Sequence, residues 1–214
     1  MFKTQHTLAF FILLCALPDV YGTFNQLQLV LRWPASFCKG KKCERTPNNF
    51  TIHGLWPDIK GTILNNCNPD AKYASVTGGK FVKRNKHWPD LILTEAASLN
   101  SQGFWAYQFK KHGTCCSDLF NQEKYFDLAL ILKDKFDLLT TFRNKGIIPK
   151  STCTINKIQK TIRTVTGVVP NLSCTPTMEL LEVGICFNRD ASKLIDCDQP
   201  KTCDTSGNTE IFFP

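Results

Sequence analysis

The sequence has few histidines, no CxxC pair and no long apolar run beyond its first residues. A membrane-spanning helix requires about 18 uninterrupted apolar residues. The longest run, Leu8–Leu17, is shorter, so we expect no contact with a membrane. The nearest approach to a zinc site is His112 with Cys115 and Cys116. Because adjacent cysteines cannot both readily bind one tetrahedral ion, we expect no metal and no cofactor.

Residues 1–22 have the pattern of a secretory signal peptide. Lys3 precedes the apolar run, Pro18 ends it, and a short segment ending at Gly22 supplies the cleavage site. Cleavage there would leave residues 23–214, a length that fits one domain. A buried N-terminal helix is the alternative. We therefore expect a secreted, extracellular and monomeric protein.

The sequence has eleven cysteines, and ten remain if Cys15 leaves with the signal peptide. An even number at this density in an exported chain predicts disulfides. Ten cysteines allow far too many pairings for spacing alone to fix the connectivity. Two local pairs are nevertheless suggested, Cys38 with Cys43 around a lysine-rich turn and Cys186 with Cys197 across a loop.

Two N-glycosylation sequons occur, at Asn49 in NFT and at Asn171 in NLS. Sequons have meaning only in an exported chain, and they also arise by chance. Asn49 lies four residues before His53, so a glycan there would stand near that segment but point to solvent.

The chain is basic, with a formal net charge of +8. A basic secreted protein suits a polyanionic substrate, because phosphates are attracted to positive surface at long range. Solubility alone is the alternative explanation, so the charge does not by itself select nucleic acid.

Hydrophobic periodicity predicts a mixture of helices and strands. Alternation over 24–33 predicts a strand with one buried face, and 51–56 and 182–187 read as further strands. Helical spacing occurs over 89–100, where Pro89 would occupy the first helical position, and over 104–113, 125–139 and 155–165. The polar stretch 65–86 predicts an exposed loop. Because no βαβ rhythm is present, the fold class is α+β.

Two histidines lie in matching contexts, TIHGLWPD at 51–58 and FKKHGTCC at 109–116. Helical spacing would place Gln108, Lys111 and His112 on one face. Histidine is the side chain whose ordinary pKa lets one copy act as a base and another as an acid near neutrality. With the lysine, His53 and His112 are what a metal-free ribonuclease needs; two satisfied core histidines are the alternative.

These two segments, in this order, resemble the active-site segments of the ribonuclease T2 family. The resemblance extends along the chain through LQLVLRWPASFC, QEKYFDLALILKDKFDLL, PNLSC, EVGICF and IDCDQPKTC, which are similar to the S-ribonucleases of nightshade-type plants. It implies a disulfide-stapled domain with a twisted antiparallel sheet and flanking helices. It further implies the pairs Cys67–Cys115 and Cys174–Cys203, and it leaves Cys116 and Cys153 open.

The family resemblance implies cleavage of single-stranded RNA through a 2′,3′-cyclic phosphate without a metal. His112 would be the base, His53 the acid, and Lys111 the source of positive charge. Many relatives carry a His-Glu pair where this chain has Tyr107 and Gln108, so the role of Gln108 is restricted to hydrogen bonding with a phosphate oxygen. This departure puts the speed of the enzyme in doubt.

Base binding is expected to use stacking on aromatic rings. The resemblance points to Trp56 and Phe104, whereas Trp33, Trp88 and Trp105 are read as packing residues. Arg32 stands where relatives commonly have glutamine; it could contact phosphate or be a solvated charge at the end of a strand.

S-ribonucleases are pistil glycoproteins that mediate gametophytic self-incompatibility, so the resemblance implies pollen-side recognition proteins as partners. Recognition is expected in the basic, polar segment 68–87, which lacks core periodicity. Two alternatives stay open. An extracellular nutritional or defence ribonuclease is disfavoured by the basic pI of about 8.9 and by Gln108, and a catalytically silent binding glycoprotein is disfavoured because both histidines are present.

Overall fold

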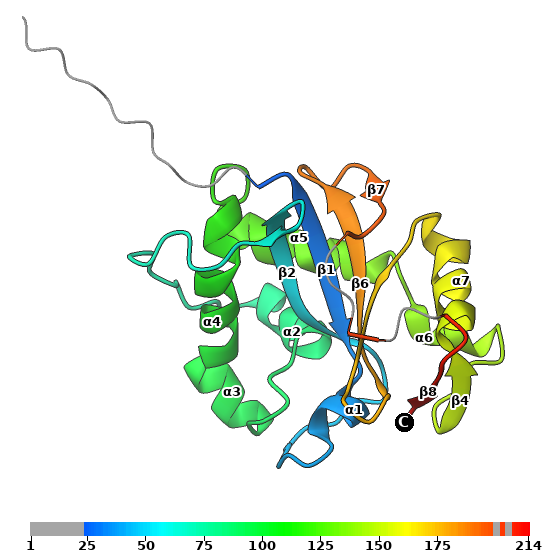
Figure 1. Cartoon of the computed structure of the whole chain (residues 1–214). Coiled ribbons are helices and arrows are strands. Elements are labelled where there is room, and N and C mark those ends of the chain that lie inside the picture. Colours follow the sequence, from blue (N-terminus) through cyan, green and yellow to red (C-terminus); the bar gives the residue numbers. More distant parts are fainter. Residues whose placement is uncertain (1–23, 199–201, 204–206) are drawn as a thin grey trace, which may run out of the picture.

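The computed structural model describes residues 24–198, 202–203 and 207–214, so the predicted signal peptide lies outside the described residues. A central antiparallel sheet runs through the middle of the molecule (Figure 1). Its strand order is β3-β2-β1-β6-β5, with β7 paired to β6. The strands are β1 (Gln26–Arg32), β2 (Thr51–Ile59), β3 (Thr62–Ile63), β5 (Asn171–Cys174), β6 (Leu180–Asn188) and β7 (Leu194–Ile195). This sheet and its helices confirm the α+β class.

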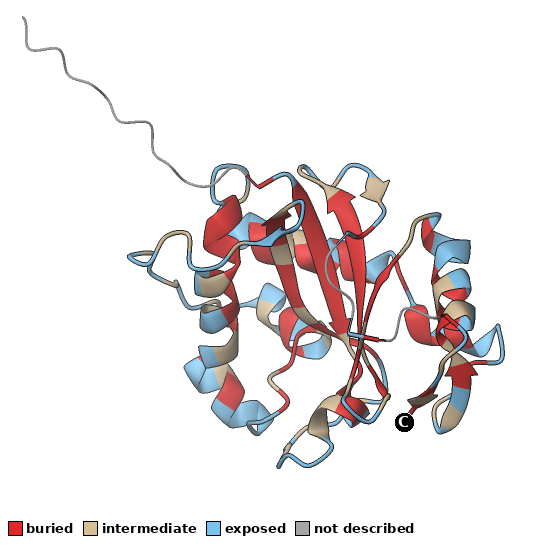
Figure 2. Ribbon diagram, viewed as in Figure 1, coloured by how far each residue is buried: buried red, intermediate tan, exposed pale blue. Residues whose placement is uncertain are grey.

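Helices surround the sheet, and the strands at its centre are the most buried part of the molecule (Figure 2). A second sheet pairs β4 with β8. The remaining elements are α1 (Pro34–Cys38), α2 (Gly79–His87), α3 (Glu95–Ser101), α4 (Gly103–Lys111), the 3-10 turn η1 (Gly113–Cys116), α5 (Gln122–Asp134), α6 (Leu138–Arg143), β4 (Ser151–Thr154), α7 (Ile155–Thr166) and β8 (Glu210–Phe213). None of the helices within the described ranges is long and apolar enough to cross a membrane.

Strand β1 is buried on both faces, which corrects the prediction of one buried face. Leu27, Leu29 and Leu31 pack in the hydrophobic core. The glutamines on the opposite face are also buried, since Gln26 donates to Asp198 at 2.8 Å and Gln28 accepts from Asn171 at 3.2 Å. Amide side chains can be buried there because neighbouring polar groups satisfy them. The sheet therefore has an apolar face and a polar, enclosed face.

The predicted helix at Pro89 begins later. Helix α3 starts at Glu95 and is capped by Thr94, whose hydroxyl accepts from the Ala97 amide at 3.3 Å. Asp90 instead accepts from the amides of Ile92 and Leu93 and so stabilises a turn. The start of the helix is therefore set by the capping hydroxyl of Thr94 and not by Pro89.

The segment predicted as an exposed loop, 65–86, contains helix α2 (Gly79–His87). Lys80 pairs with Glu123 and Asp127, and Lys83 pairs with Asp134, which ties α2 to α5. Arg84 is 1% exposed and its guanidinium lies 3.8 Å from the centre of the Phe126 ring. The sequence pattern misses this helix because its most buried residues, Arg84 and Asn85, are polar, while Phe81 is only partly buried and Val82 is exposed.

The structure contains four disulfides, namely Cys38–Cys43, Cys67–Cys115, Cys174–Cys203 and Cys186–Cys197. These are the local pairs and the pairs that the family resemblance implied. Cys116 and Cys153 are free and buried, so they form no fifth bridge. Cys115 has its sulfur in a disulfide and is therefore not a zinc ligand.

Candidate active site

A bulge in β2 places His53. Val30 of β1 pairs with Gly54 and the next residue, Leu31, pairs with Ile52, so His53 is an extra residue without a partner on β1. Bulges bend a strand and redirect a side chain, often beside active sites. Trp88 holds the backbone here, because its indole N–H donates to the His53 carbonyl at 2.9 Å.

The end of α4 places the second histidine. Gln108 and Lys111 lie in the last turn of α4, and His112 caps it, with its backbone amide donating to the Gln108 carbonyl at 3.0 Å. The Cys67–Cys115 disulfide fastens the following turn, η1. Gln108 and His112 are buried, at 1% and 3% exposed, while Lys111 is half-buried.

Trp56 contacts both histidines. Its ring stacks on His112 with centroids 5.1 Å apart and meets the edge of His53 at 5.2 Å. Gly54 makes room for this arrangement, since a Cβ there would lie 2.3 Å from Trp56 Nε1 and 2.6 Å from Gln108 Oε1. The structure thus brings together the two histidines, Trp56 and Gln108 from distant parts of the chain.

His53 lies in a buried network of charges. Its Nδ1 is 2.7 Å from Glu182 Oε1 and 2.7 Å from Arg32 Nη2, and Arg32 Nε donates to the same Glu182 oxygen at 2.9 Å. Burial lowers the pKa of His53; the hydrogen bond and charge of Glu182 raise it, and Arg32 and Lys111 lower it further. Although burial raises the pKa of Glu182, His53 and Arg32 hold that pKa below its ordinary value.

His112 has no carboxylate partner among the residues that the structure describes, and its Nδ1 has no hydrogen-bond partner. Burial lowers the pKa of His112 to about 3, the positive charges of Lys111 and His53 add to this, and the backbone of Leu64 opposes it. The ring is therefore neutral at ordinary pH, and a neutral imidazole can accept a proton.

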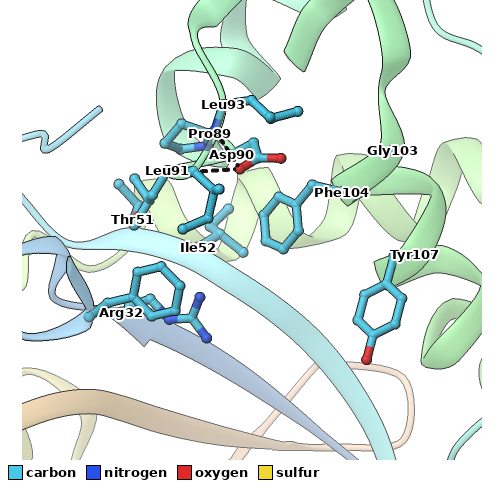
Figure 3. A pocket seen from close by; sticks show the side chains of 12 residues that line it. Arg32, Thr51, Ile52, Pro89, Asp90, Leu91, Leu93, Gly103, Phe104 and Tyr107 are labelled. Atoms are coloured by element: carbon cyan, nitrogen blue, oxygen red, sulfur yellow. Dashed lines mark hydrogen bonds between the residues drawn. The ribbon is translucent and has the colours of Figure 1, made fainter. Parts of the chain in front are cut away.

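A cavity of about 290 Å³ opens beside Arg32 and is lined by β1, β2 and α4. Phe104 and Tyr107 project from α4 toward it, Arg32 lies across from them, and Asp90 lies beside Phe104 in the segment that also supplies Pro89, Leu91 and Leu93 (Figure 3). Trp56 is not among its lining residues, so the structure separates the two aromatic residues that were predicted to stack on bases. Arg32 is not the solvated charge considered as an alternative, because its side chain is 13% exposed.

A second cavity, of about 240 Å³, lies on the polar face of the sheet and is lined by Trp56, Asp58, Glu182 and Asn171, among others. Asp58 is 1% exposed, its Oδ1 accepts from the Leu64 amide, and its Oδ2 has no hydrogen-bond partner in the described ranges. Burial raises the pKa of Asp58 to about 6. Trp56 Nε1 and Asn171 Oδ1 are also buried and have no hydrogen-bond partner among the residues whose structure is described, so this cavity offers unused donors and acceptors.

The two predicted glycosylation sites have opposite environments. Asn49 is exposed, as a glycan acceptor must be. The Asn171 side chain is 7% exposed and hydrogen-bonded to Gln28 inside the sheet. A glycan on that amide does not fit this packing, so Asn171 is no longer a candidate.

Sequence reasoning missed Glu182 and Asp58 as site residues. Glu182 belongs to the EVGICF segment, which was read only as a strand, and it reaches His53 because β6 lies beside β1. An acidic residue at the start of an otherwise apolar strand was the available signal. Asp58 lay within the TIHGLWPD motif and could have been singled out as a carboxyl two residues from a stacking tryptophan.

Comparison with known proteins places the chain in a family. The Ribonuclease T2 family model matches residues 24–197. The chain is 51% identical to Ribonuclease S-2 of Nicotiana alata, over 100% of both chains.

Several solved structures are similar to this one, and two of them illustrate the likeness. The crystal structure of the self-incompatibility-associated SF11-RNase of Nicotiana alata matches with a TM-score of 0.84 and 46% identity, over 89% of this chain and 99% of that one. A mutant of RNase MC1 in complex with 5′-GMP matches with a TM-score of 0.76 and 30% identity, over 89% and 100%. The chain therefore belongs to the ribonuclease T2 family of metal-independent endoribonucleases, and its sequence is similar to those of S-ribonucleases.

Proposed function

We propose that this protein is a secreted endoribonuclease that cleaves single-stranded RNA through a 2′,3′-cyclic phosphate and acts as a pistil determinant of gametophytic self-incompatibility. The observation that carries the catalytic part is the cluster of the two histidines around Trp56, with the positive charge of Lys111 acting on both rings. RNA contains its own nucleophile, the 2′-hydroxyl, next to the phosphorus. The enzyme therefore needs a base, an acid and positive charge.

His112 is the base and His53 the acid in this proposal. The 2′-oxygen bonds to phosphorus as His112 takes its proton, and the bond from phosphorus to the 5′-oxygen breaks as His53 delivers a proton to that oxygen. The environments support this division. His112, with its pKa lowered to about 3, is neutral and able to accept a proton. Burial also lowers the pKa of His53, but the facing Glu182 carboxylate opposes this shift by stabilising the protonated ring.

Lys111 supplies positive charge to the phosphorane that develops during the reaction. Gln108 faces the same space as Trp56, and its Oε1 lacks a partner. Its amide can hydrogen-bond to a phosphate oxygen but supplies no charge. The positive charge in this proposal therefore comes from Lys111.

The two cavities are the proposed base sites. One contains Trp56 and the other Phe104, and they lie on either side of the His53–Glu182–Arg32 network: Glu182 lines the first and Arg32 the second. A dinucleotide could place one base in each cavity and its phosphate between them. Two of the nitrogens of Arg32 already contact Glu182 and His53, so a contact with substrate would fall to its remaining nitrogen, Nη1.

The catalytic proposal is tested with His53→Asn and His112→Asn, assayed on single-stranded RNA with and without EDTA. We expect each variant to lose about 10²–10⁴-fold in rate, with a 2′,3′-cyclic phosphate as the first product of the wild type. Half-buried His87→Asn serves as the control. Activity above about a hundredth of wild type in either site variant, or sensitivity of the wild type to EDTA, would contradict the proposal.

The role in self-incompatibility is supported by the similarity to S-ribonucleases, and recognition is assigned to segment 68–87. The structure refines the design of its test, because Arg84 and Asn85 are buried on the inner side of α2 and must be retained. Exposed positions between 69 and 83 should be exchanged for those of a second allele, and the chimera expressed in styles. Unchanged pollen rejection with full ribonuclease activity would refute this assignment.

Two other functions predict different results. A nutritional or defence ribonuclease would be expressed outside the mature style and would not affect pollen. A silent binding glycoprotein would show no cleavage in the wild type. Transcript location and the first assay therefore separate the three.

A further inference from the structure

The Nδ1 nitrogen of His53 has two neighbours of opposite charge at the same distance. Glu182 Oε1 and Arg32 Nη2 each lie 2.7 Å away. The three side chains are largely buried, with exposed fractions of 20% for His53, 13% for Arg32 and 11% for Glu182. Water therefore screens their interactions little.

One ring nitrogen cannot satisfy both neighbours at once. If Nδ1 carries a proton, it donates to Glu182, and Arg32 then faces an N–H group. If Nδ1 carries a lone pair, it accepts from Arg32, and the ring proton of the neutral histidine lies on Nε2. The two partners thus favour different protonation states.

Only the first state suits a general acid that must be used repeatedly. Protonated His53 gives its Nε2 proton to the leaving oxygen and becomes the neutral form with a proton on Nδ1, which keeps its hydrogen bond to Glu182. Nε2 can then be protonated again without any rearrangement of the ring. In the state that Arg32 favours, the ring is neutral and holds its proton on Nε2, where it is a very weak acid.

We infer that Glu182 is a positioning residue that fixes the proton on Nδ1 of His53, and that Arg32 opposes it at the same nitrogen. This inference rests on the proposed role of His53 as the acid. The other charged or titratable groups that face His53 are Lys111 on α4, whose charge repels a protonated ring, and His112 at the end of α4, which is neutral at ordinary pH. Within the described part of the chain, Glu182 is the one carboxylate in contact with His53.

The two neighbours should move the pH profile in opposite directions. Activity requires protonated His53, so it is lost as pH rises through the pKa of that ring. Removing the charge of Glu182 lowers this pKa and shifts the loss of activity to lower pH. Removing Arg32 raises the pKa and shifts the loss to higher pH.

The first experiment measures kcat and KM against pH for Glu182→Gln and Arg32→Gln. For Glu182→Gln we expect kcat to fall about tenfold or more, with KM within about twofold, because the interaction serves the reacting step. For Arg32→Gln we expect a smaller change in maximal kcat, and we expect the alkaline limb of the pH profile to move to higher pH. Glu179→Gln is the matched control, since Glu179 is 4% exposed, pairs with Lys39 and lies just before β6; its profile should equal that of the wild type.

The second experiment reads the ring directly by ¹⁵N NMR of the histidines, with His53 assigned by its loss in His53→Asn. We expect neutral His53 to carry its proton on Nδ1 in the wild type and in Arg32→Gln, and this preference to weaken in Glu182→Gln. This readout does not depend on activity. If Glu182→Gln folds poorly, the position of the proton on His53 in the wild type and in Arg32→Gln still tests the inference.

A proton on Nε2 in neutral wild-type His53 would overturn the inference. So would a shift of the alkaline limb of the pH profile in the same direction in Glu182→Gln and Arg32→Gln. Failure of the proposed function looks different. In that case His53→Asn would retain activity while the NMR signal still reported a proton on Nδ1 facing Glu182.

Discussion

The two histidines of the site have opposite surroundings although their sequence contexts match. His53 sits in a bulge of β2 against Glu182 and Arg32, whereas His112 caps α4 with no carboxylate nearby in the described chain. A carboxylate partner favours a protonated ring, and burial beside other positive charges favours a neutral one. The difference teaches that acid and base are set by the strands and helices that surround each ring and not by the HG dipeptide they share.

The largest expected effect concerns how His112 is held. The Cys67–Cys115 disulfide closes a 48-residue separation and ends three residues beyond His112. Replacing both cysteines by serine should cost about 2–5 kcal/mol of unfolding free energy, measured by denaturant titration. Below the unfolding transition, catalysis should also fall because η1 is no longer fastened.

The matched control for the disulfide is Cys38→Ser with Cys43→Ser, which opens a bridge of separation 5. A shorter loop constrains the unfolded chain less, so the loss of stability should be smaller and activity nearly unchanged. Equal losses in the two double variants would show that η1 does not depend on its disulfide.

The next largest expected effect is on stability, and it distinguishes two carboxyl groups on the polar face of the sheet. Glu182 is compensated by His53 and Arg32, while Asp58 has no cation partner among the described residues and its pKa is raised to about 6. A raised pKa in the folded state stabilises the protein at low pH, and this stabilisation is lost as pH rises through about 6. Asp58→Asn should therefore raise stability at pH 8 by up to about 3 kcal/mol and change it little at pH 4.

Urea unfolding at both pH values measures this effect, with exposed Asp70→Asn as the control. A loss of stability at pH 8 would mean that the Asp58 carboxylate has a partner in solution. Such a result would remove the contrast with Glu182.

A third change disturbs both histidines through Trp56. In Gly54→Ala the new methyl group would overlap the Trp56 and Gln108 side chains. We expect activity to fall about tenfold or more, because displacing reacting groups by about an ångström greatly lowers the rate. Gly79→Ala is the control, since a Cβ at Gly79 meets nothing within 4 Å. Full activity of Gly54→Ala would show that Trp56 can move without consequence.

The mildest test alters only the pH. The base must be neutral, which His112 is above about 3, and the acid must be protonated, which fails above the lowered pKa of His53. We expect kcat/KM to be highest at acidic pH and to fall by up to about tenfold per pH unit on the alkaline side. Circular dichroism over the same range checks that the protein stays folded; a maximum above pH 7 would reverse the assignment of environments.

The sequence was sufficient for much of the fold. Alternation predicted β1 and β6, and helical spacing predicted α5 and α7, although Val165, placed in the stripe of α7, is 45% exposed. It was insufficient for α2, whose buried side consists of Arg84 and Asn85. Periodicity detects apolar faces, and α2 packs through the Arg84 guanidinium on aromatic rings with only Phe81 as a partly buried apolar contact.

The sequence by itself determined the residue types of the chemistry: His53, His112 and Lys111 are recognisable because their motifs are local in the chain. Only the tertiary structure decided which histidine faces a carboxylate, since Glu182 is more than a hundred residues from His53 and reaches it across β1. It also decided that Arg32 is buried, that Asn171 lies inside the sheet, and that Trp56 and Phe104 serve separate cavities. Such properties depend on the register between strands, and register is set by the packing of the whole sheet.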